Sequence, residues 1–248
     1  MSEARATASG GPEPSPRGWV DRAAGADGFA LRGAAPADDV ALAWAGLALP
    51  LLGFGVGLGV RALVVALEGS ATPFALAGVA ASGLWLLGGR GFARTATAGF
   101  GRAVAAAAAL LLLGVELALF SLLGSSGTLA MPLAGLLGRW ALVVLAYGSQ
   151  PAPGDDVATR LVKQLGFNQF AVASVSAMAL TLLLVDAIGL LLLFAVATQT
   201  IALRIVAHSR RGGVTRSVLG AGAALGELTT LMLSAALVGL RSALLAVD

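Results

Sequence analysis

The 248-residue sequence contains no cysteine, one histidine (His208) and one lysine (Lys163). The lack of cysteine excludes disulfides, thiolate metal sites and a cysteine nucleophile, and a single histidine excludes the histidine-rich cages typical of zinc. Charge is scarce as well, because 12% of the residues are charged, about half the share in a soluble domain. The net charge of +3 comes almost entirely from arginine, and we expect no nucleic-acid partner.

Apolar residues and glycine are abundant instead, at 58% of the chain and 34 residues respectively. Residues 1–39 are an exception, because they contain Pro12, Pro14, Pro16 and Pro36 among scattered charges and no sustained apolar period. Such a segment buries too little apolar surface to fold. We therefore predict a disordered cytoplasmic tail over residues 1–39, followed by a transmembrane domain over residues 40–248.

Seven apolar stretches approach the roughly 20 residues that a helical membrane span requires. The second and fifth are short, and only Asp186 and Ala187 separate the fifth from the sixth. The sequence predicts an all-α, polytopic transmembrane helical bundle of about seven spans, or six if the fifth and sixth form one re-entrant hairpin. The stretches are Val40–Leu67, Pro73–Leu87, Val104–Leu123, Ala130–Tyr147, Phe170–Val185, Ile188–Ala207 and Val218–Leu240.

The basic residues indicate how these spans are oriented. With the N-terminus in the cytoplasm, the outer connections contain only Glu68, an uncharged segment at 124–128, Asp186 and a tail with Arg241 and Asp248. This distribution satisfies the positive-inside rule. The residues that then lie inside are Arg5, Arg17, Arg22, Arg32, Arg90, Arg94, Arg102, Arg160, Lys163, Arg204, Arg210, Arg211 and Arg216.

Small residues in the first and last spans predict close helix packing, because they let two backbones approach. An interior proline, Pro50, predicts a kink in the first span, since it removes a backbone hydrogen bond. The small residues are Gly53, Gly55, Gly57 and Gly59 in the first span, and Gly220, Ala221 and Ala224 in the last.

A glycine-rich basic loop at residues 88–97 is the first candidate for a ligand site. Its glycines, among them Gly91, allow backbone N–H groups to approach an anion, and Arg90 and Arg94 supply positive charge next to Thr95. Together they are suited to hold phosphate. The alternative is a loop whose charge only satisfies the positive-inside rule.

A second candidate is Arg139, which lies in the middle of the fourth span. An arginine at membrane depth requires a carboxylate, a carbonyl or a ligand phosphate. Glu116 and Glu227 are the candidate partners within the protein. Pairing inside the protein and binding of a ligand phosphate both remain open.

The third candidate precedes the last span, where Arg210, Gly212, Gly213 and Thr215 lead into a helix that carries Glu227 at membrane depth. A helix N-terminus favours a bound anion, which makes these residues further candidates for phosphate binding. The alternative is that Thr215 and Ser217 only cap the helix. No paired carboxylates share a helical face, and no phosphate-binding GxxxxGK[ST] loop is present.

Four blocks of the sequence resemble the cobalamin synthase family, adenosylcobinamide-GDP ribazoletransferase, over roughly residues 41–237. Its Gly-Gly-x-Thr-Gly-Asp-x-Leu-Gly-Ala block gives the most specific match. The blocks are Leu49–Gly53 with Gly57, Gly138–Ala141 followed by Tyr147, Gly212–Ala221 ending at Glu227, and Arg90–Thr97.

The last of these blocks departs from the family pattern of Asp-Gly-Leu-Ala-Asp-Thr-x-Asp. Arg90, Arg94 and Thr97 replace its three aspartates, and Ser217 replaces the aspartate of the C-terminal block. By resemblance these aspartates bind Mg²⁺. Arginines at such positions repel a divalent cation rather than bind it, so the sequence contains no intact metal site, and we name no catalytic residue.

The resemblance implies an enzyme of the bacterial cytoplasmic membrane that joins alpha-ribazole, or its phosphate, to adenosylcobinamide-GDP and releases GMP with Mg²⁺. Its partners are the lipid bilayer and the corrinoid and nucleotide substrates. The alternative is a non-catalytic paralogue that serves as partner or scaffold in corrinoid assembly, within a homo-oligomer or beside an intact paralogue. A small-solute transporter is disfavoured, because the spans lack paired interrupted helices in two matching halves.

Overall fold

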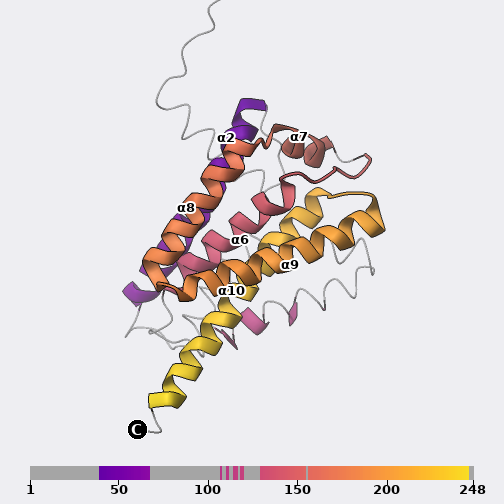
Figure 1. Cartoon of the computed structure of the whole chain (residues 1–248). Coiled ribbons are helices and arrows are strands. Elements are labelled where there is room, and N and C mark those ends of the chain that lie inside the picture. Colours follow the sequence, from indigo (N-terminus) through magenta and orange to yellow (C-terminus); the bar gives the residue numbers. More distant parts are fainter. Residues whose placement is uncertain are drawn as a thin grey trace, which may run out of the picture.

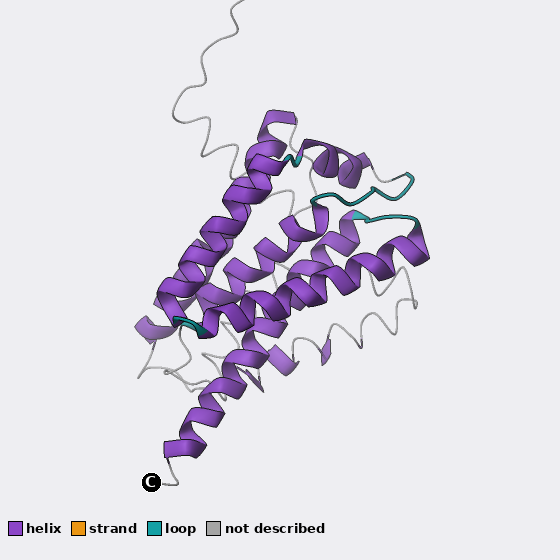
Figure 2. Ribbon diagram, viewed as in Figure 1, coloured by secondary structure: helices purple, strands orange, loops and turns teal. Residues whose placement is uncertain are grey.

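The computed structural model describes residues 39–67, scattered helical positions between 107 and 119, and residues 129–154 and 156–245. These parts of the chain contain no β-sheet, which confirms the all-α fold class for them (Figures 1 and 2). The complete helices are α2 (Asp39–Leu67), α6 (Ala130–Ala146), α7 (Asp156–Gln164), α8 (Phe167–Val185), α9 (Ile188–Arg211) and α10 (Arg216–Leu245).

Helix α6 forms the centre of the bundle. It is apolar apart from Arg139, and all of its 17 residues except Val144 are buried. Helices α2, α8, α9 and α10 each contact it (Figure 1). A helix that is hydrophobic on every side is stable only where other helices cover every side. The remaining elements are therefore arranged around α6.

Glycines allow α2 to pack directly against α6. A Cβ atom on Gly53 would collide with the backbone of Gly135, and one on Gly57 would lie 2.5 Å from the carbonyl oxygen of Met131. Gly55 has open space around it, as does Gly59. The predicted close packing is thus confirmed for Gly53 and Gly57 and does not apply to the two alternating glycines. The helix continues through Pro50, and the kink stays a prediction.

A second close approach joins α6 to α10. A Cβ on Gly226 would lie 3.1 Å from the Cα of Gly138, and one on Gly222 would lie 2.9 Å from the side chain of Leu145. Small residues were predicted in this helix at positions that include Ala221 and Ala224, and both are buried. The glycines that face α6, however, are Gly222 and Gly226. They lie four residues, about one helical turn, apart, so both are on the same face of α10.

Within the described ranges, four helices are long and apolar enough to cross a membrane, over Ala48–Ala66, Phe167–Val185, Ile188–Arg211 and Arg216–Leu240, which indicates a multi-pass membrane protein. The fifth predicted stretch begins three residues earlier than expected and contains 19 residues. Because α8 and α9 each reach spanning length, two spans are favoured over one re-entrant hairpin. The second predicted stretch and most of the third lie outside the described residues.

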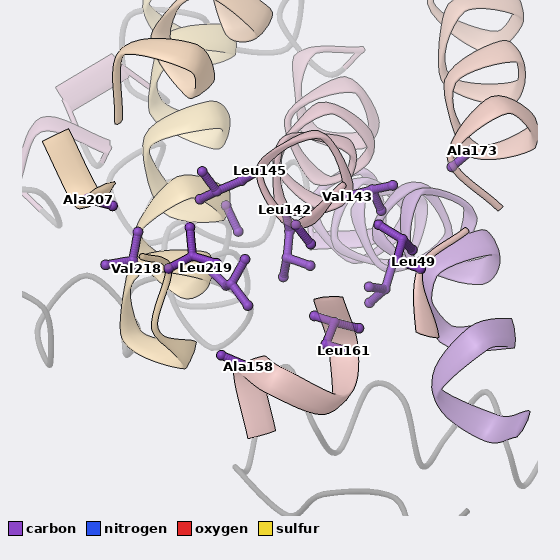
Figure 3. Close-up of a cluster of buried hydrophobic side chains, with 14 residues drawn as sticks. Leu49, Leu142, Val143, Leu145, Ala158, Leu161, Ala173, Ala207, Val218 and Leu219 are labelled. Atoms are coloured by element: carbon purple, nitrogen blue, oxygen red, sulfur yellow. The ribbon is translucent and has the colours of Figure 1, made fainter. Parts of the chain in front are cut away.

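Helix α7 was not predicted as a separate element. Its buried residues Ala158 and Leu161 pack into a cluster with Leu49 of α2, Leu142 of α6 and Leu219 of α10 (Figure 3). Arg160 and Lys163 are exposed. This separation of apolar and basic residues is typical of a helix that lies along a membrane surface.

The connections group at two ends of the bundle (Figure 2). Residues 147–154, helix α7 and residues 212–215 lie at one end, whereas the turn at Asp186 and Ala187 lies at the other. The first end contains six basic residues, and Arg61 lies toward the opposite end of α2. The sequence predicted the connections after the fourth and sixth spans on one side of the membrane and the connection after the fifth span on the other. The structure agrees with this arrangement. The six are Arg160, Lys163, Arg204, Arg210, Arg211 and Arg216.

Candidate functional site

Two loops pair with each other at the basic end of the bundle. The amide of Ala152 donates to the carbonyl of Val214 at 2.9 Å, and the amide of Val214 donates to the carbonyl of Gln150 at 2.8 Å. These bonds form an isolated parallel bridge between Pro151 and Val214. The loop after α6 and the loop before α10 therefore hold each other in a fixed position, although about 60 residues separate them in the sequence.

Side chains from α9 fix the first of these loops. Arg204 donates to the carbonyl of Tyr147 at 3.1 Å and also to that of Gly148. One turn later, His208 Nε2 accepts the Gln150 amide at 3.1 Å, while its Nδ1 lies 2.9 Å from the carbonyl oxygen of Arg204. Because Nε2 accepts here, the proton of the neutral imidazole is on Nδ1, which donates to that carbonyl. Both side chains position the loop.

The second loop connects α9 to α10 through conformations that suit glycine. Gly212 ends α9 with a left-handed φ of 68°, and its amide donates to the carbonyl of His208 at 3.1 Å. A Cβ on Gly213 would lie 2.5 Å from the carbonyl oxygen of Gln150, so only glycine lets the two loops pair. Thr215 caps α10, because its Oγ1 accepts the amide of Val218 at 3.2 Å.

Positive charge lies beside the loop pair. Arg210 and Gly212 are exposed, whereas Gly213 is buried. The N-terminus of α10, which begins at Arg216, adds the partial positive charge of a helix start. Such a surface attracts an anion with several charges, such as a phosphate ester.

A buried ion pair lies deeper in the bundle. Arg139 Nη1 on α6 is 3.6 Å from Glu227 Oε1 on α10, and both side chains are only 1% exposed. A Cβ on Gly53 would lie 2.6 Å from Cγ of Arg139, and one on Gly138 would collide with Cγ of Glu227. Two glycines thus provide the space in which the two charged side chains meet. This geometry favours the expected partner within the protein over a ligand phosphate for Arg139.

Glu116 is a second acid in the interior, also 1% exposed. Its carboxyl group interacts electrostatically with that of Glu227. One carboxyl oxygen of Glu116 and both of Glu227 lack a hydrogen-bond partner, as do Nε, Nη1 and Nη2 of Arg139. In the described part of the bundle, the interior therefore contains one arginine and two glutamates with polar atoms that lack a hydrogen-bond partner.

A comparison with protein families identifies the chain. The model described as cobalamin-5-phosphate synthase matches residues 99–235, which is more than half of the sequence. The chain belongs to the cobalamin-5-phosphate synthase family. No significant match was found among curated proteins or among solved structures.

The family match covers the whole region from α6 to α9, both paired loops and α10 as far as Ala235. Among the predicted site residues of this family member, the structure brings Arg210, Gly212, Gly213 and Thr215 together at the basic end. It places Arg139 with Glu227 in the interior. The remaining predicted residues, Arg90, Gly91, Arg94, Thr95 and Thr97, lie outside the described residues.

Two residues that hold the loops, Arg204 and His208, were not predicted as site residues. Their spacing of four residues on one helix was visible in the sequence, and it places both side chains on one face. Their partners, however, are backbone atoms of residues 147–150. Backbone partners leave no pattern of residue types in a sequence.

The residues that the structure describes do not fit the Mg²⁺ that the family resemblance implies. Ser217 occupies the first turn of α10 where the family has an aspartate, and within the described ranges no three His, Asp or Glu side chains form a metal-binding group. Glu227 faces the guanidinium of Arg139, and this charge opposes a divalent cation. We therefore derive no catalytic step through a metal ion.

Proposed function

We propose that this chain is a cobalamin synthase-like membrane transferase that joins alpha-ribazole, or its phosphate, to adenosylcobinamide-GDP and releases GMP. The observation that carries the proposal is the family match over residues 99–235. The paired basic loops lie within that range. In this proposal the basic end of the bundle faces the cytoplasm of a bacterial cell.

The paired loops provide the binding surface for the substrate phosphates. Arg210 is exposed, and the fixed backbone at Gly212 and Gly213 keeps the start of α10 at a constant position beside it. Arginine holds phosphate oxygens through two parallel hydrogen bonds. The predicted partners from the 88–97 loop, Arg90 and Arg94, add positive charge to the same phosphates in this proposal.

The same charge assists the transfer itself. As GMP leaves, negative charge grows on the oxygen that joins it to the corrinoid phosphate. Preorganised cations and helix N-termini stabilise such charge without having to reorganise. The buried Arg139–Glu227 pair supports the site indirectly, because it fixes α10 against α6 beneath the loops.

Release of GMP by the purified protein tests this proposal. The protein in nanodiscs, supplied with alpha-ribazole or its phosphate, adenosylcobinamide-GDP and Mg²⁺, is expected to release GMP above a protein-free control. Arg210→Ala is expected to weaken substrate binding and to lower kcat/KM. Arg61→Ala, which removes an arginine toward the opposite end of the bundle, is the matched control. Absence of turnover in the unaltered protein would refute the transferase.

The second candidate is a non-catalytic paralogue that acts as a partner or scaffold subunit in corrinoid assembly. The replacement of family aspartates by Arg90, Arg94, Thr97 and Ser217 favours it, because the group that would bind Mg²⁺ is absent from the sequence. Complementation of a strain that lacks its cobalamin synthase separates the two. Growth with the unaltered chain supports the enzyme. Growth only after Arg90→Asp and Arg94→Asp, or co-purification with an intact paralogue, supports the partner.

A further inference from the structure

Among the described residues, three ionisable side chains lie in the interior of the bundle, and their charges do not balance. Arg139, Glu116 and Glu227 are each 1% exposed. If all three were ionised, the interior would carry one excess negative charge. The other charged side chains of the described helices lie toward helix ends, where solvent or lipid headgroups can reach them, and α8 contains none.

Arginine neutralises only one of the two acids. The guanidinium of Arg139 lies 3.6 Å from Glu227, and an opposite charge at this range stabilises an ionised carboxylate. Among the described residues, no arginine, lysine or histidine forms an ion pair with Glu116. Glu227 in addition presents its own negative charge to Glu116.

An unpaired carboxylate is not tolerated in this environment. Burial of an ion without a partner costs so much free energy that the group takes up a proton instead, and the hydrocarbon region enforces this for isolated acids. Glu116 has a buried carboxyl oxygen without a partner, and neither oxygen of Glu227 accepts a hydrogen bond. A proton on Glu116 would remove the excess charge and supply a donor where acceptors are unpaired.

We propose that Glu116 is a proton-binding site within the membrane, so that protonated Glu116, ionised Glu227 and positively charged Arg139 leave the interior without excess charge. One proton is taken from water, and no bond other than the new O–H bond is formed. The proposal does not depend on the transferase activity. It assigns different protonation states to two glutamates with the same exposure.

Infrared spectroscopy of the purified protein in nanodiscs tests the proposal. At neutral pH the carbonyl-stretch band of a protonated carboxyl group is expected in the unaltered protein and is expected to disappear in Glu116→Gln. The double variant Arg139→Met with Glu227→Gln is the matched control: it removes both charges, leaves Glu116 unpaired, and should retain the band, shifted by the loss of its charged neighbours. A missing band in the unaltered protein, or an unchanged band in Glu116→Gln, overturns the proposal.

A labelling experiment on the unaltered protein guards against a variant that fails to fold. Dicyclohexylcarbodiimide is apolar, so it enters the bilayer, and it reacts with a protonated carboxyl group. The acid proton moves to a carbodiimide nitrogen as the carboxyl oxygen bonds to the central carbon, and the adduct rearranges to a stable N-acylurea without a leaving group. Mass spectrometry is expected to find the adduct on Glu116 and not on Glu227. An adduct on Glu227 alone, or on neither glutamate, overturns the proposal.

Thermal unfolding gives a third readout. Glutamine resembles a protonated glutamic acid in shape and charge, so Glu116→Gln is expected to leave the Tm nearly unchanged. Glu227→Gln removes the counter-charge of Arg139 and is expected to lower the Tm clearly. An equal loss of Tm in both variants would mean that Glu116 is also ionised, and it would overturn the assignment.

Discussion

Arg139 shows how a single charged residue determines which small residues surround it. Its stem passes over Gly53 of α2, and its guanidinium faces Glu227, whose own stem passes over Gly138. A larger residue at either glycine would occupy the space of a charged side chain. The glycines therefore allow close helix packing and also accommodate the ion pair.

Loss of one partner of this pair is expected to destabilise the protein more than loss of both. Arg139→Met leaves Glu227 without a counter-charge and is expected to cost about 3 kcal/mol, as for other buried pairs. Glu227→Met is expected to cost a similar amount. The double variant should be more stable than the sum of the two losses predicts, because no unpaired charge remains.

A double-mutant cycle measured by chemical unfolding in detergent quantifies this coupling. Thr230→Val is a control on α10, since its hydroxyl donates to the carbonyl of Gly226 within the same helix. Combined with Arg139→Met, it is expected to show little coupling. Additive losses for Arg139→Met and Glu227→Met would contradict the ion pair.

Much of this pair could be inferred from the sequence. An arginine at membrane depth needs a carboxylate, a carbonyl or a ligand phosphate as its partner, and two candidate carboxylates, Glu116 and Glu227, were visible in the sequence. The choice between them depends on how α6 and α10 are aligned. That alignment is set by contacts such as Gly138 against Gly226, which follow from the folded structure and not from the local pattern.

At the scale of elements, the backbones of α2 and α6 are in direct contact. Gly53 and Gly135 approach each other so closely that neither position has space for a Cβ. In a membrane, where lipid is as apolar as the side chains, such backbone contact and van der Waals packing drive helix association. The two helices are expected to separate if this contact is blocked.

Glycine-to-alanine variants in α2 test this contact with built-in controls. Gly53→Ala and Gly57→Ala are expected to destabilise the protein by about 2 kcal/mol each, because overpacking forces the backbones apart. Gly55→Ala and Gly59→Ala introduce the same methyl group into open space, and they are expected to be neutral or slightly stabilising. Thermal unfolding, monitored through tryptophan fluorescence, measures the difference. Equal effects at all four positions would argue against the packing.

Elements were predictable to different degrees. Spans were predictable because a helix needs about 20 apolar residues to cross the bilayer. The cap at Thr215 was predictable because its hydroxyl group can accept a hydrogen bond from a free amide at the helix start. Helix α7 was missed because nine residues with exposed Arg160 and Lys163 do not resemble a span. Its helical form depends on packing of Leu161 against α2, α6 and α10, and that surface exists only in the folded protein.

At the scale of the whole molecule, the described part of the chain carries most of its positive charge at one end. Six basic residues gather at the end with the paired loops, whereas the turn at Asp186 marks the other end. Between the ends, α8 and α9 expose large apolar side chains such as Leu183 and Phe194. Such an apolar surface is typical of a side that faces lipid, and the charge bias favours a cytoplasmic location for the basic end.

Single-cysteine labelling tests this orientation directly, because the native chain contains no cysteine. Ser209→Cys and Ala187→Cys place a thiol at exposed positions at opposite ends of α9. In intact cells whose outer membrane is permeable to the reagent, a membrane-impermeant maleimide is expected to label Ala187→Cys. Ser209→Cys should react only after the inner membrane is permeabilised. Labelling of both from outside, or the reverse pattern, would contradict the orientation.

The central position of α6 has a consequence for biosynthesis. This helix is about 25 Å long, carries Arg139, and leaves the ribosome well before α10 supplies Glu227. During that interval the nascent chain contains Arg139 in an apolar segment without its partner Glu227. Gly53 and Gly57 of α2, made earlier, offer a docking face that can retain α6 near the insertion machinery. Chains cut short before α10 would then be substrates for membrane proteases, even though every earlier helix is complete.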